Sequence, residues 1–127
     1  MKTIIAGSRT LDDPEPLLLA IDNCPWTITT IISGRAKGAD TIGEAYAEAF
    51  GIPVMSFPAD WDKQGKSAGR IRNEEMAKVA QACIVLWDGI SPGSKNMIGL
   101  AKTYGLPLMV YDFITNDYLT FNLESLR

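Results

Sequence analysis

The chain of 127 residues has the length of one domain that can bury a core. Its 46% hydrophobic and 21% charged residues are typical of a soluble globular protein. The net charge of −3 provides no general attraction to nucleic acid or to an anionic membrane, so an anion site must be built locally. Histidine is absent, which excludes the commonest general base and the commonest zinc ligand.

Cysteine usage and hydropathy point to a reducing compartment. Cys24 and Cys83 lie in apolar surroundings without metal-ligand spacing, which predicts reduced structural thiols. No signal-peptide pattern follows Met1, and no apolar stretch is long enough to cross a bilayer. We therefore expect a cytoplasmic protein without a membrane partner.

Short apolar runs alternate with amphipathic segments along the chain. Strands are expected at 3–6, 28–32, 53–57, 82–87 and 107–111. Helices are expected after the prolines at 14 and 16, over about 38–50, from about 68, and over about 94–104. For the second helix, the pattern predicts a buried face of Ile42, Ala45, Tyr46, Ala49 and Phe50.

This alternation predicts a single α/β domain with a Rossmann-like, doubly wound parallel sheet of about five strands. The domain is expected to span residues 1–111. The aromatic-rich tail, 112–127, could add a strand to the sheet or form a subunit contact.

Three polar loops follow predicted strands. They are Gly7-Ser8-Arg9, Ser33 to Asp40, and a long loop from Ala59 to Met76 that is rich in cations and contains Trp61. In a parallel sheet the carboxyl ends of the strands share one edge, so these loops are expected to converge on one crevice.

Arg72 is the most informative residue of the long loop and the helix that follows it. It lies four residues before Met76 and therefore on the same inward stripe of that helix. A guanidinium there requires either a carboxylate or a ligand anion. Arg70 is explained equally well by a surface pair with Glu74, and Asn73 could orient a ribose hydroxyl or act as a cap.

The loop after the fourth strand, Asp88 to Asn96, has the composition of a phosphate-binding turn. Its glycines and Pro92 leave backbone N–H groups exposed at the start of a helix, where Ser94 adds a hydroxyl and Lys95 a charge. The alternative is a polar turn in which Ser94 is the N-cap.

The other two polar loops and the tryptophan also have two interpretations. Gly38 allows close backbone approach to a ligand, whereas Asp40 could do no more than complement the helix dipole. Gly7-Ser8-Arg9 occupies the usual nucleotide position but lacks the full dinucleotide fingerprint. Trp61 could stack on a base or cap the sheet.

In combination, these motifs resemble the YspA-like branch of the SLOG superfamily, found in bacteria and their phages. The resemblance covers about residues 2–111 and includes Gly69 to Met76 and Gly93 to Ile98. It implies a Rossmann-like domain that binds a nucleotide-derived small molecule. The ligand-binding residues expected on this basis are Gly7, Ser8, Arg9, Ser33, Gly34, Gly38, Ala39, Asp40, Asp60, Trp61, Arg70, Arg72, Asn73, Met76, Gly93, Ser94, Lys95, Asn96 and Met97.

The superfamily also contains the Lonely Guy phosphoribohydrolases, whose catalytic arginine is matched by Arg72 four residues before Met76. Their paired glutamates fall here on Gly99 and Leu100, so no catalytic residue is assigned. One of Asp40, Asp60, Asp62 and Asp88 could substitute. Loss of the glutamates favours a sensor or sequestering protein over an N-glycosidase that cleaves nucleoside phosphates.

Other partners follow less directly from the resemblance. Nucleic-acid binding, as in the superfamily member DprA, is disfavoured by the acidic balance of the chain. No cofactor or metal site is expected, although a phosphate ligand could bring magnesium with it. The resemblance and the aromatic tail predict a homo-oligomer.

Overall fold

Residues 1–126 are described by the computed structural model, in which six strands form one sheet in the order β3-β2-β1-β4-β5-β6. The strands are β1 (Lys2–Gly7), β2 (Thr30–Ser33), β3 (Val54–Ser56), β4 (Ala82–Trp87), β5 (Leu108–Asp112) and β6 (Asp117–Phe121). The first five strands are parallel to one another, and β6 is antiparallel to β5. The predicted α/β, Rossmann-like fold is confirmed.

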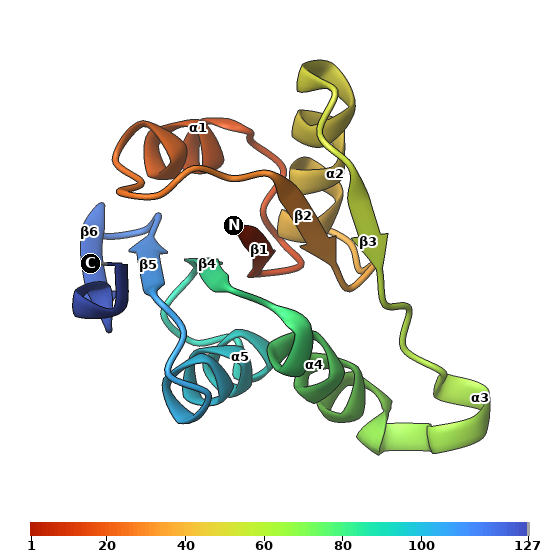
Figure 1. The fold of residues 1–127 in the computed structure, drawn as a ribbon. Helices are drawn as coiled ribbons and strands as arrows, with labels where there is room; N and C mark the ends of the chain where they lie inside the picture. The colour runs from red at the N-terminus through yellow and green to blue at the C-terminus, as the bar shows by residue number, and fades with distance from the viewer. Residues whose placement is uncertain (127) are drawn as a thin grey trace.

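Helices cover both faces of the sheet (Figure 1). They are α1 (Glu15–Asp22), α2 (Ala39–Phe50), α3 (Trp61–Gln64), α4 (Ala68–Val79) and α5 (Pro92–Thr103), with short 3₁₀ turns at Gly65–Ser67 and Leu123–Leu126. Figure 1 shows α1 and α2 on one side of the sheet and α4 and α5 on the other. Because side chains alternate along a strand, Ile5 faces the first layer and Ile4 the second.

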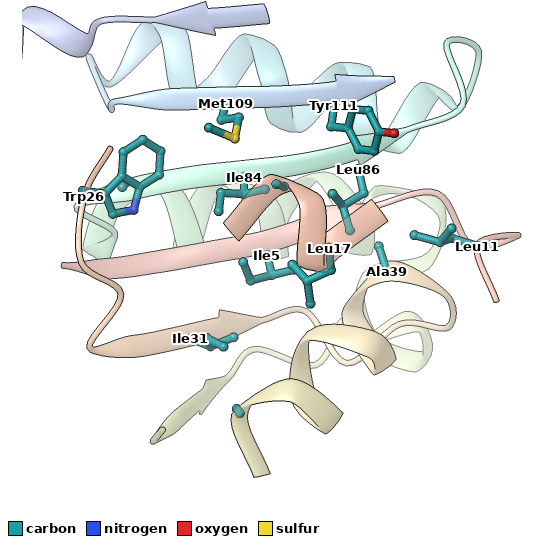
Figure 2. Packing of buried hydrophobic residues seen from close by; sticks show 13 residues of the cluster. Ile5, Leu11, Leu17, Trp26, Ile31, Ala39, Ile84, Leu86, Met109 and Tyr111 are labelled. Carbon is teal, nitrogen blue, oxygen red and sulfur yellow. The ribbon is translucent and has the colours of Figure 1, made fainter. Parts of the chain in front are cut away.

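The two cores hold these layers in place. Leu17 of α1 and Ala39 of α2 pack over Ile5 and Leu86 in the first core (Figure 2). In the second core, Met76 of α4 and Met97 of α5 pack against the opposite face of the sheet. From β1 the chain adds β2 and then β3 on one side of the sheet, and from β4 it adds β5 and β6 on the other side. The direction in which strands are added therefore reverses between the neighbouring strands β1 and β4. Such a reversal opens a crevice at the carboxyl ends of the strands.

The predicted buried face of α2 is wrong. Phe50 is 65% exposed and Ala45 and Ala49 are also exposed, whereas the buried positions are Ala39, Asp40, Gly43 and Ala47. Ile42 and Tyr46 are half-buried at the margin of this stripe. The reason is close packing: a Cβ at Gly43 would lie only 2.9 Å from Ile5 Cγ2. Small residues therefore face the sheet, and this rotation of α2 turns Asp40 inward.

The aromatic tail folds back on the sheet of its own chain. Strand β6 pairs with β5 over five positions, from Leu108–Phe121 to Asp112–Asp117. Tyr118 stacks on Tyr111 with ring centroids 4.5 Å apart, and Lys102 Nζ lies 4.0 Å from the centroid of Phe121. Much of the aromatic surface of the tail is covered in this way, and the homo-oligomer stays a prediction.

We expect Gly43→Val to destabilise the fold by about 1–3 kcal/mol, because the added methyl groups overlap Ile5 in a packed core. Gly99→Val is the matched control, since a Cβ at Gly99 of α5 meets no atom within 4 Å. Urea denaturation of both variants measures the difference. Equal stabilities would show that α2 does not depend on close approach to β1.

Candidate functional site

Two adjoining cavities lie at the carboxyl ends of the strands. The first has a volume of about 380 Å³ and lies between the β1 loop, α4 and the start of α5. The second, of about 370 Å³, lies between the β2 loop and Trp61. Arg9, Ala36 and Arg72 line both cavities, so the two are halves of one crevice.

A hydrogen-bond network shapes the loop between β4 and α5. The Asp88 N–H donates to the buried Ser8 Oγ at 3.0 Å, and the Asp88 carboxylate accepts from the N–H groups of Ile90 and Ser91 at 2.9 and 2.8 Å. Ser91 Oγ also donates to this carboxylate at 2.8 Å. Burial raises the pKa of Asp88, but these hydrogen bonds outweigh it and hold the pKa at about 2. Asp88 is therefore an ionised structural group.

Arg72 is buried on the inward stripe of α4, next to Met76. Its Nε donates to Asn73 Oδ1 at 3.0 Å, and its Nη1 donates to the Gly34 carbonyl. Within residues 1–126 the single ion pair joins Arg35 to Glu44, so no carboxylate neutralises Arg72 directly. Burial lowers the pKa of Arg72, and the nearby charge of Asp40 opposes this shift. Among the described residues Arg72 forms no ion pair, and its hydrogen bonds go to neutral groups.

Asp40 is the acidic residue of the first cavity. Its Oδ2 accepts the Ala36 N–H at 3.1 Å, and the residue is only 6% exposed. Burial raises the pKa of Asp40, although the Ala36 hydrogen bond and the charge of Arg72 both act to lower it. Of the four aspartates that could replace the missing glutamates, Asp40 alone lines a cavity.

Helix α5 begins at the first cavity, and several hydrogen-bond donors of its first turn have no acceptor among the described residues. Ser91 occupies the N-cap position, so the alternative in which Ser94 is the N-cap is wrong. Ser94 is 4% exposed, lines the cavity, and its hydroxyl has no hydrogen-bond partner among the described residues. In that same part of the chain, the N–H groups of Gly93 and Ser94 also find no acceptor, as is usual in a first helical turn.

Asn73 connects α4 to α5. Its Nδ2 donates to Asn96 Oδ1 at 2.9 Å, while its Oδ1 accepts from Arg72. The side-chain amide is thus occupied by protein groups on both sides. Asn73 sets the distance between Arg72 and the first turn of α5.

Trp61 forms one wall of the second cavity. It is 50% exposed, and Arg9 Cζ lies 5.8 Å from the centroid of its ring, within the range of a cation–π contact. Asp60 does not reach the crevice, because its carboxylate caps α3 by accepting the Lys63 N–H at 3.1 Å.

The structure brings together most of the residues expected at the site. Those that line a cavity are Gly7, Arg9, Gly34, Asp40, Trp61, Arg72, Asn73, Met76, Gly93, Ser94 and Met97. Those that lie outside both cavities are Ser8, Ser33, Gly38, Ala39, Asp60, Arg70, Lys95 and Asn96. Ser8, Ser33 and Ala39 are buried behind the crevice, whereas Asp60, Arg70 and Lys95 are exposed to solvent.

Several lining residues carry no chemistry that sequence patterns detect. Thr10 and Ala36 line the first cavity because their loops pass it. Ser91 could have been found from its spacing, since an aspartate three residues before a serine is typical of a turn closed by side-chain hydrogen bonds.

Comparison with known proteins identifies the family of the chain. The sequence profile of the YAcAr family, described as the YspA, cpYpsA-related SLOG family, matches residues 1–64. The chain belongs to this SLOG family. It is also similar to the "Gene 61 protein" of Mycobacterium phage D29, with 30% identity over 118 residues, which covers 85% of this chain and 94% of the phage protein. No solved structure matches the chain significantly.

The part that matches the family profile holds the β1 and β2 loops and Trp61, whereas Arg72 and α5 follow it along the chain. Residues 1–126 contain no cluster of three or more side chains that could hold a metal ion. None of their helices is both long and apolar enough to cross a membrane.

Because burial holds the pKa of Asp40 above its ordinary value of 3.8, the native state binds this proton more tightly than the unfolded chain. Ionisation of Asp40 therefore lowers the free energy of unfolding as the pH rises. We expect Asp40→Asn to be more stable than the parent at neutral pH, with the difference shrinking on acidification. Urea denaturation across the pH range measures it.

Asp62→Asn is the control, since Asp62 is exposed and outside both cavities. A parent protein more stable than Asp40→Asn at neutral pH would mean that Arg72 stabilises the charged carboxylate.

Proposed function

We propose that the chain binds a nucleotide-derived small molecule, with a phosphate group in the first cavity, and acts as a sensor or sequestering protein for it. The observation that carries this proposal concerns two buried groups that line the same cavity. The buried Arg72 guanidinium lacks a carboxylate partner in the described residues, and the Ser94 hydroxyl in the same cavity lacks any partner there.

Both groups are costly in an empty site. A buried cation whose charge is only partly compensated, here by the nearby Asp40, and a buried hydroxyl without a hydrogen bond each lower the stability of the native state. A phosphate would accept from the guanidinium, from the Ser94 hydroxyl and from the free N–H groups at the start of α5. One ligand group would therefore satisfy all these donors.

The remaining groups suit the rest of a nucleotide. The Asp40 carboxylate lines the first cavity and could accept hydrogen bonds from ribose hydroxyls. Asn73 serves this purpose less well, because protein groups already occupy its amide. Trp61 offers a half-exposed ring on which a base could stack.

The test is a calorimetric titration of Arg72→Ala with nucleoside 5′-monophosphates of the common bases. Loss of a charged hydrogen bond should weaken binding about 10- to 100-fold. No ion pair is lost in residues 1–126, but the hydrogen bonds to Gly34 and Asn73 are, so we expect only a modest fall in the melting temperature.

Arg70→Ala is the matched control. It removes the same charge from the same helix, but Arg70 is exposed and lines neither cavity. A melting temperature far below that of the parent, with unchanged nucleotide affinity, would identify Arg72 as a structural group and place the site elsewhere.

A second candidate function, hydrolysis of the N-glycosidic bond of a nucleoside phosphate, is favoured by one observation. Asp40 is a buried carboxyl group with a raised pKa, and it lines the same cavity as Arg72. Burial raises the pKa of this carboxyl group, which makes the protonated form more available as a proton donor than in an exposed aspartate.

Release of free base from nucleoside 5′-monophosphates distinguishes the two functions. We expect no turnover above background, because Gly99 and Leu100 stand where the family resemblance expects glutamates. Turnover that falls about 10²–10⁴-fold in Asp40→Asn would instead establish the enzyme, with Asp40 as its acid–base group.

A further inference from the structure

The second cavity is strongly cationic and has no acidic lining. Arg9, Lys37 and Arg72 contribute to its wall, together with Arg35. Among residues 1–126, only Arg35 of these four forms an ion pair, with Glu44. No carboxylate lines this cavity within residues 1–126, in contrast to the first cavity, where Asp40 does.

Such a concentration of positive charge is unexpected in a chain whose net charge is −3. Like charges around one space repel each other, and the repulsion falls when an anion enters. Lys37 is exposed and has no ion-pair or hydrogen-bond partner in the described part of the chain, so its ammonium group is available. The cation–π contact of Arg9 with Trp61 holds a second cation beside it.

The second cavity adjoins the first, so its positive charge lies next to the proposed phosphate site. Arg72 lines both cavities and stands between the start of α5 on one side and Lys37 on the other. A ligand with a single phosphate in the first cavity would leave Lys37 without an anionic partner.

We propose that the ligand carries two phosphate groups on one nucleoside, the first beside Ser94 and the second between Arg9 and Lys37. This inference rests on the proposed function, because it places the first phosphate in the same cavity. It adds a specificity: the second cavity selects doubly phosphorylated nucleotides over monophosphates. Two chemistries share this property, a diphosphate chain and two phosphates at separate ribose positions.

The test compares the affinities of the intact protein for a nucleoside 5′-monophosphate, the 5′-diphosphate and the 3′,5′-bisphosphate of each common base, at one ionic strength. At least one of the doubly phosphorylated forms should bind about tenfold more tightly than the monophosphate, the worth of one additional charged hydrogen bond. Whichever form binds more tightly identifies how the two phosphates are arranged.

Lys37→Ala should remove most of this advantage while changing the monophosphate affinity less than about twofold. Lys78→Ala is the control, because it removes the same charge from an exposed position of α4 outside both cavities. Equal affinities for all three nucleotides, or an equal loss in both lysine variants, would overturn the second phosphate site and leave the proposed function intact. Failure of every nucleotide to bind would overturn both.

Discussion

The Arg72 guanidinium is the group on which the geometry of the crevice depends. It donates to the Gly34 carbonyl of the β2 loop and to the side chain of its neighbour Asn73, so it ties the β2 loop to α4. Gly34 must come very close: a Cβ there would lie 2.5 Å from Arg72 Nη1 and 3.0 Å from Asp40 Oδ2. Asn73 in turn donates a hydrogen bond to Asn96, which connects Arg72 to α5. A buried cation thus links the β2 loop, α4 and α5 without an ion-pair partner in the described residues.

A second constraint, the close approach of α2 to the sheet, places Asp40 opposite this cation. Gly38 begins the helix at φ +76°, and a Cβ there would lie 2.2 Å from the Ser8 carbonyl oxygen. Gly43 then meets Ile5 one turn later. These contacts hold the first turn of α2 against the β1 loop and bury the Asp40 side chain. The fold therefore maintains a carboxyl group and a guanidinium in one cavity, each with a pKa that burial shifts against its charged form.

Sequence patterns predicted the sheet and the location of the crevice well, because both follow from strand–helix alternation and from the polar loops between elements. The inward position of Arg72 followed from its spacing to Met76. The face of α2 was mispredicted, since periodicity favours the bulky Tyr46 and Phe50 whereas close packing requires the small Ala39, Gly43 and Ala47. Local sequence also cannot tell an exposed polar side chain from a lining one, which is why Arg70 and Lys95 were expected at the site. The unpaired Ser94 hydroxyl and the bridging role of Asn73 depend on contacts distant in sequence, and only the folded structure reveals them.

The central claim is that the Arg72 guanidinium has no ion-pair partner in the described residues and holds a ligand phosphate instead. A crystal structure of the protein with a nucleoside 5′-monophosphate tests this claim most directly. We predict that the phosphate lies in the first cavity, within hydrogen-bond distance of the Arg72 guanidinium and Ser94 Oγ. A phosphate bound elsewhere, with Arg72 closed onto Asp40 as an ion pair, would contradict it.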